Sequence, residues 1–342
     1  MSARTVRLTA ALAAALLAPA AQAYVRTTSS SGACFYWQER IIGFKINAAR
    51  VATSQSCGDT TQSVDTAAIE AVRAGFRMWT GEIQACTDLQ LFDDGLTDSR
   101  SIGFDQRNGA VNENLVVFRA GWCSERADGG LDDPCWDVDP FATPGAIGET
   151  CANKYNCFED AQPGDRATIA VTTVTHEPRS GRIRDADIEL ADWNGQPGAL
   201  ASNQPPDGWY FTCTDDTSTR CGSYGQPDCA YIDLQSNVTH EVGHFVGLAH
   251  PCEIGTPDCG AGSPYRSVVM FPTASLASTS KRVLTSDDRA GVCDIYPVGH
   301  PTATCVPESG GGGGGCASGG AGGILSALLA LAALARRAPR AP

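Results

Sequence analysis

The chain has 342 residues, of which 42% are hydrophobic and 18% are charged, and its formal net charge is −13. This length is sufficient for one sizeable hydrophobic core. The acidic balance argues against nucleic acids and anionic lipid surfaces as partners, because both are negatively charged.

The first 23 residues predict a secretory signal peptide. Arg4 and Arg7 precede a mostly apolar run, and the A-x-A sequence at 21–23 is typical of a cleavage site. The apolar run is too short to span a bilayer. We therefore expect the protein to be exported.

Cysteine usage agrees with export. The chain contains 15 cysteines, and 14 of them precede Cys316. In an exported protein this even number predicts up to seven disulfides, although the spacing does not determine which cysteines pair.

The region from 24 to 300 combines strand and helix patterns. Apolar residues recur at three or four over 64–79, which predicts one amphipathic helix. Runs typical of strands occupy 35–47, 89–92, 115–118 and 167–175.

A turn signal at 177–181 joins the strand at 167–175 to a second strand at 183–190. The second strand alternates, so it presents apolar side chains on one face and acidic side chains on the other. The acidic residues are Asp185, Asp187 and Glu189. The two strands are predicted to form a hairpin.

Two cysteine-rich insertions, 119–165 and 191–232, lack any hydrophobic period. They are predicted to be loops held by disulfides. The first contains a group of aspartates that could bind calcium or could be solvated loop charges, namely Asp128, Asp132, Asp133, Asp137 and Asp139.

The sequence HEVGHFVGLAH at 240–250 carries the strongest chemical signal. It follows Asp233, a candidate helix N-cap. On a helix, His240 and His244 lie one turn apart on the same face, so both can bind one metal ion. Gly247 can adopt the positive φ that ends the helix and brings His250 in as a third ligand. Three protein ligands leave the fourth position of a catalytic zinc free.

Chance and core packing are the alternative explanations for this motif. A bare HExxH occurs often by chance, but five fixed positions in eleven do not. Only five histidines occur in the chain, and three of them are in this motif. Core packing does not explain three histidines at ligand spacing.

Two signals follow the motif. SVVMFP at 267–272 contains Met270, and 285–288 has the pattern of a capping box that begins a short helix before Pro297. The methionine could be ordinary adaptable core or part of the site.

The motif, Met270 and the last helix together resemble the metzincin zinc endopeptidases, and among them the matrixin-like branch, over residues 34–297. The resemblance implies an α+β, zincin-like catalytic domain: a mixed, mostly parallel twisted sheet with an antiparallel edge strand, a zinc-site helix, a Met-turn and a C-terminal helix. It implies that His240, His244 and His250 bind Zn²⁺, that Glu241 is the general base for a zinc-bound water, and that Gly247 and Met270 are structural. Substrate is expected along the edge near 167–175, with a side-chain pocket formed by 261–273.

The C-terminal end predicts a glycine-rich linker over 301–316 and an apolar segment over 317–342 that closes with Arg336, Arg337 and Arg340. This tail resembles the MYXO-CTERM sorting signals of myxobacterial surface proteins. That resemblance implies attachment to the cell surface or outer membrane, or secretion after C-terminal processing. A plain membrane anchor is the alternative.

These features predict an exported zinc endopeptidase that acts on proteins or peptides, with a monomer expected. One alternative is a catalytically weak, zinc-containing adhesion or binding protein at the cell surface. Another is a zinc amidase that acts on wall polymers.

Overall fold

A computed structural model describes residues 24–47, 57, 66–105, 109–122, 156–158, 167–192, 208–222 and 229–305. The predicted signal peptide, the apolar C-terminal segment and the aspartates at 128–139 lie outside the described residues. Among the helices of the described part, none combines the length and the apolar character needed to cross a bilayer.

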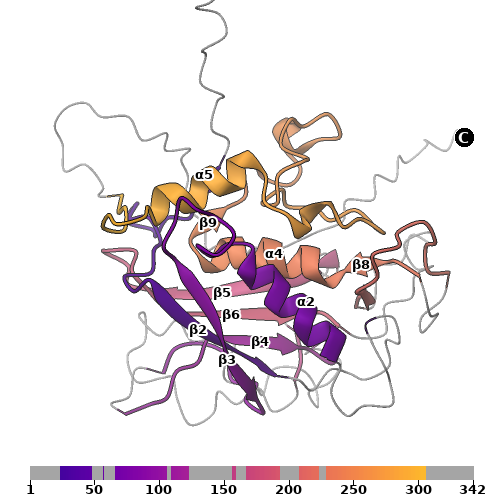
Figure 1. Cartoon of the computed structure of the whole chain (residues 1–342), viewed down its shortest axis with the longest axis horizontal. Helices are drawn as coiled ribbons and strands as arrows, with labels where there is room; N and C mark the ends of the chain where they lie inside the picture. The colour runs from indigo at the N-terminus through magenta and orange to yellow at the C-terminus, as the bar shows by residue number, and fades with distance from the viewer. Residues whose placement is uncertain are drawn as a thin grey trace, which may run out of the picture.

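A five-stranded sheet in the order β3-β2-β4-β6-β5 forms the centre of the fold (Figure 1). Its parallel pairs are β2–β3, β2–β4 and β4–β6, whereas β5 lies at one edge and runs antiparallel to β6. The strands are β2 (Ile41–Asn47), β3 (Gln90–Thr97), β4 (Leu115–Phe118), β5 (Ala170–His176) and β6 (Ile183–Leu190). The mixed, mostly parallel sheet agrees with the fold that the resemblance implied.

Three α-helices are found in the described part of the chain: α2 (Thr66–Arg77), α4 (Leu234–Phe245) and α5 (Ser286–Ile295). Helix α2 connects the parallel strands β2 and β3, which require a crossover. In the view of Figure 1, α4 lies above β5 and α5 lies above α4. Helix α2 confirms the predicted amphipathic helix, but it ends at Arg77, so Trp79 lies in the turn that follows it.

Short elements complete the fold. The strands are β1 (Val25–Arg26), β7 (Phe211–Thr212), β8 (Ile232–Asp233) and β9 (Leu248–Ala249), and the 3₁₀ turns are η5 (Pro257–Cys259) and η6 (Ser280–Arg282). The predicted strand over 35–47 is shorter than expected, because residues 38–40 bend and β2 begins at Ile41.

Five disulfides join cysteines of the described part. Two of them close short loops, as the sequence suggested, and three connect distant segments. The pairs are Cys34–Cys305, Cys57–Cys213, Cys86–Cys293, Cys221–Cys229 and Cys252–Cys259. Cys305, which lies in the predicted linker, is thereby attached to the start of the domain, and Ala303 N donates to Ile295 O nearby.

Apart from the exposed Arg184, strand β6 is buried on both faces. Its apolar side chains belong to the main core, and Asp185, Asp187 and Glu189 on the other face are at most 4% exposed. Glu189 pairs with the fully buried Arg119. Asp187 accepts hydrogen bonds from Gly103 N at 2.6 Å and Leu115 N at 2.8 Å. The acidic face is therefore covered by protein groups, namely the backbone at 103 and 115 and the Arg119 side chain.

Asp185 and Asp187 are hydrogen-bonded to each other inside this layer. Burial raises the pKa of Asp185 well above its usual value, and the adjacent Asp187 raises it further. Burial also raises the pKa of Asp187, to about 6. Since backbone N–H groups favour a charged Asp187, Asp185 holds the proton of the pair.

We predict that Asp185→Asn stabilises the protein at pH 7 and has little effect at pH 4. The pKa of Asp185 is higher in the folded than in the unfolded protein, so folded Asp185 keeps its proton at a pH where the unfolded side chain has released it. The free energy of unfolding of the wild type therefore falls as pH rises from the unfolded pKa to the folded pKa. The side-chain amide of the variant cannot ionise and still donates to Asp187. The variant should therefore keep the stability that the wild type loses, a gain in the free energy of unfolding on the order of 1–2 kcal/mol at pH 7.

The measurement is the free energy of unfolding by urea at several pH values. The exposed Asp258→Asn provides the control and should leave the pH dependence unchanged. If Asp185→Asn is less stable than the wild type, and the difference in free energy of unfolding grows with rising pH, Asp185 does not hold the proton of the pair.

Candidate metal centre

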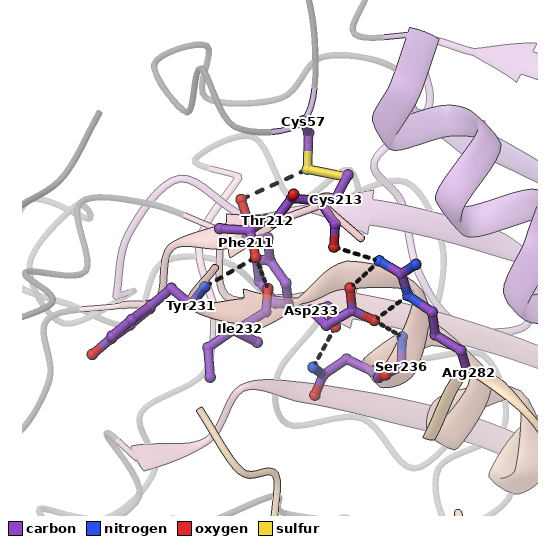
Figure 2. Close-up of a disulfide and its surroundings, with 11 residues drawn as sticks. Cys57, Phe211, Thr212, Cys213, Tyr231, Ile232, Asp233, Ser236 and Arg282 are labelled. Carbon is purple, nitrogen blue, oxygen red and sulfur yellow. Dashed lines mark hydrogen bonds and ion pairs between the residues drawn. A yellow bond between two sulfur atoms is a disulfide. The ribbon is translucent and has the colours of Figure 1, made fainter. Parts of the chain in front are cut away.

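Helix α4 is almost entirely buried, and its start is fixed by charge. Asp233 is the N-cap residue, as predicted, and accepts from Ser236 N at 2.8 Å. The Arg282 guanidinium binds both carboxylate oxygens of Asp233 (Figure 2), at 2.9 and 2.6 Å. The same guanidinium donates to Thr214 O, next to the Cys57–Cys213 disulfide. These contacts set the position of the helix from which the motif side chains project.

The three motif histidines converge on one point. His250 Nε2 lies 3.1 Å from His240 Nε2 and 3.1 Å from His244 Nε2. Two nitrogens bound to one tetrahedral zinc at 2.0–2.1 Å would lie roughly 3.3 Å apart. In the part of the chain that the structure describes, this is the group of three or more metal-binding side chains whose donor atoms come together.

The hydrogen bonds of the rings direct their lone pairs to this point. His240 Nδ1 is 2.6 Å from Val269 O, and His244 Nδ1 is 2.8 Å from Leu248 O. A carbonyl accepts only from a protonated nitrogen, so each Nε2 carries a lone pair.

Burial keeps the imidazoles neutral. It lowers the pKa of His244 to about 4 and lowers the pKa values of His240 and His250 well below the usual value. Three neutral imidazole nitrogens this close can all be ligands of one cation. The residues therefore fit a metal ion with three nitrogen ligands.

Gly247 reverses the chain after α4. Its φ is +100°, and an added Cβ would lie 2.6 Å from Phe35 O. Gly247 O accepts from Thr27 N at 2.9 Å, and β9 then pairs with β1. The positive φ predicted from the sequence is confirmed, and it places His250 beside the other two rings.

Glu241 lies fully buried next to the histidines. Thr172 of β5 donates from Oγ1 to Glu241 Oε2 at 2.7 Å, while Oε1 has no hydrogen-bond partner among the residues that the structure describes. Burial raises the pKa of Glu241 to about 8, and the bond from Thr172 and the charge of Lys281 partly oppose this rise. Once ionised, such a carboxylate is a strong proton acceptor.

Met270 packs against the middle of α4. It is 2% exposed, and an added Cβ at Gly243 would overlap its sulfur. Asp288 holds this turn by accepting from Val269 N and Met270 N, and it also forms the predicted capping box of α5 with Thr285. Met270 thus lies beneath the two helix histidines as a packing residue.

A cavity of about 40 Å³ lies between the first turn of α4 and the segment 271–281. The predicted pocket range 261–273 supplies only Arg266, Phe271 and Thr273 to its lining. Lys281, which the sequence analysis missed, is buried in the lining, and its Nζ is 3.5 Å from His240 Nδ1. Burial lowers the pKa of Lys281 to about 7.

Thr172 was missed as well. Nothing in the sequence distinguishes it from the other threonines of its strand. Lys281 did carry a signal, since it is one of only three lysines in the chain.

Comparison with known proteins gives a partial relationship. No family model matches the sequence. The chain is 42% identical over 66 residues to Metalloendoproteinase 1-MMP of Arabidopsis thaliana, and the match covers 19% of this chain and 14% of that relative. This similarity relates the protein to metalloproteases at the level of a hydrolase, and the three-histidine cluster agrees with a metal.

We predict that Gly247→Ala destabilises the fold and weakens metal binding. The new Cβ would overlap Phe35 O, so the turn must move and displace His250. A loss of about 2 kcal/mol or more is expected, together with at least about tenfold weaker zinc affinity. Gly255→Ala is a matched control, because Gly255 also has a positive φ, +87°, but open space around the added Cβ.

Chemical unfolding and a competition titration with a zinc chelator would measure the two effects. Equal zinc affinity in the Gly247→Ala and Gly255→Ala variants would show that this turn does not position the third histidine.

Proposed function

We propose that the protein is an exported, zinc-dependent endopeptidase of the metzincin type, with a matrixin-like catalytic domain. The observation that carries the proposal is the buried Glu241 carboxyl group, with one free oxygen, beside three converging imidazoles. A site that only bound a metal would gain nothing from a partly unsatisfied buried carboxyl group at this position.

The roles of the chain's own residues follow from their chemistry. His240, His244 and His250 would hold zinc, which polarises a scissile carbonyl and acidifies a water. Glu241 accepts a proton from the attacking water and delivers it to the leaving amine. Thr172 positions Glu241 by holding Oε2, which leaves Oε1 as the atom that exchanges the proton.

The substrate is proposed to lie extended along β5. This strand is at the edge of the sheet, and its Thr172 contacts the general base. An extended peptide can pair with the backbone of an edge strand, which favours binding of many sequences. Proteins and peptides are therefore the proposed substrates.

Export and surface attachment are proposed from the two ends of the chain. The signal peptide at 1–23 and the tail at 317–342 support them, and disulfides are typical of oxidising compartments outside the cytosol.

The two alternatives differ in what they cleave. A surface adhesion protein would bind zinc without turnover, and an amidase would cleave wall polymers but not proteins. Casein cleavage that stops with a zinc chelator would favour the endopeptidase over both. Mass spectrometry of products from an unbiased peptide library would then give the side-chain preference.

We predict that Glu241→Gln retains zinc but lowers kcat/KM for peptides by about 10²–10⁴-fold, because the amide cannot accept the proton. His250→Ala should instead lose zinc and activity together, because one of three ligands is missing. Metal analysis and peptide hydrolysis on the same samples separate the two effects. Wild-type turnover by Glu241→Gln, or full zinc occupancy in His250→Ala, would refute the assigned role of that residue.

Thr172→Val should shift the pH dependence of peptide hydrolysis. The hydroxyl hydrogen bond lowers the pKa of Glu241, so its loss raises that pKa and moves the acidic limb of kcat/KM upward, by about one pH unit. Thr173→Val is the matched control, since its side chain is exposed on the other side of β5. If both variants have the wild-type profile, Thr172 does not position the base.

A further inference from the structure

The cavity beside His240 is small and polar. Its walls are the first turn of α4, including Ser236, and the segment that ends at Lys281. Its volume of about 40 Å³ is roughly the space of three water molecules, which suits a carboxylate group better than an aromatic ring.

Two polar groups of the lining are incompletely satisfied. Lys281 Nζ donates to Phe271 O, but no carboxylate of the described residues forms an ion pair with it. Ser236 Oγ is buried and lacks a hydrogen-bond partner in the described part of the chain. A buried cation without a counterion is costly, as is a buried hydroxyl without a partner.

No carboxylate of the cavity lining is available to Lys281, although the charges of Glu241 and Asp288 outside the lining favour its protonated form. Asp233 also lines the cavity, but the Arg282 guanidinium occupies both of its oxygens. Arg266 adds a second positive charge, with its guanidinium carbon 5.6 Å from the centre of the Phe271 ring. The lining therefore offers two basic side chains and several hydroxyl groups, and its one carboxylate is already paired.

The position of Lys281 determines which part of a substrate could reach it. Nζ lies 3.5 Å from His240 Nδ1, and His240 Nε2 faces the metal position. Lys281 therefore lies behind the His240 ring, on the side away from the metal position. A substrate side chain that reached Lys281 would belong to a residue close to the scissile bond.

We propose that this cavity selects an acidic side chain, Asp or Glu, next to the scissile bond, and that Lys281 is the specificity-determining residue. The proposal rests on the endopeptidase function stated above. The substrate carboxylate accepts from Lys281 Nζ and Ser236 Oγ, and so supplies the partners that both groups lack. The preferred substrates are accordingly acidic segments of proteins.

Peptide hydrolysis tests the proposal directly. Once a library has located a cleaved bond, peptides that differ only in the flanking residue, Glu, Gln or Leu, are compared by kcat/KM. The wild type should prefer Glu over Gln by about tenfold, the effect of one charge-assisted hydrogen bond. Lys281→Met should abolish this preference, whereas Lys281→Arg should retain it.

Lys45→Met is the matched control, because Lys45 pairs with Glu113 at the sheet, away from the cavity. It should retain the wild-type ratio of Glu to Gln. Zinc content and circular dichroism of each variant show whether it has folded, and Lys281→Gln replaces Lys281→Met if the latter does not fold.

The outcomes separate this proposal from the proposed function. Cleavage without a preference for Glu, or a preference that survives in the folded Lys281→Met or Lys281→Gln variant, overturns the role of Lys281 and leaves the endopeptidase function intact. Absence of cleavage of any peptide contradicts the endopeptidase function. In that case calorimetry with the wild-type protein decides the cavity's selectivity: tighter binding of a library peptide that contains Glu than of its counterpart with Gln supports it, and equal or absent binding overturns it.

Discussion

The reversal of the chain at Gly247 controls the geometry of the candidate site. Helix α4 can carry two histidines on one face, but a straight helix would take a third histidine ten residues later away from them. The positive φ of Gly247 lets the backbone turn against Phe35 O, where a Cβ does not fit. Pairing of β9 with β1 then fixes the direction of the chain up to His250. Backbone conformation at one residue therefore determines whether two or three imidazoles face the candidate metal position.

Charged side chains at the ends of helices stabilise the surroundings of these ligands. Asp233 caps α4 and binds Arg282. This ion pair connects η6, which carries part of the cavity lining, to the start of α4. Asp288 caps α5 and also binds the backbone at 269–270, where Val269 O accepts from His240. Each carboxylate is buried, so each is fully hydrogen-bonded, as a buried charge must be. The same bonds that stabilise the fold thus orient the site.

Features encoded within a few residues were predictable from the sequence. The ligand motif, the Asp233 cap, the hairpin of β5 and β6 and the capping box of α5 each depend on local spacing. Contacts between distant segments were not predictable: Thr172 and Glu241 are 69 residues apart, Lys281 and His240 are 41 apart, and Cys34 and Cys305 are 271 apart. The burial of the acidic face of β6 was not predictable either. Alternating apolar and acidic residues show that the strand has two different faces, but they do not show which distant segments cover each face.

X-ray absorption at the zinc edge of the purified protein tests the central claim most directly. We expect one zinc per chain, with three imidazole nitrogens at about 2.0–2.1 Å and one further light ligand. A spectrum with sulfur ligands, or with fewer than three imidazoles, would contradict the convergence of His240, His244 and His250 on one ion.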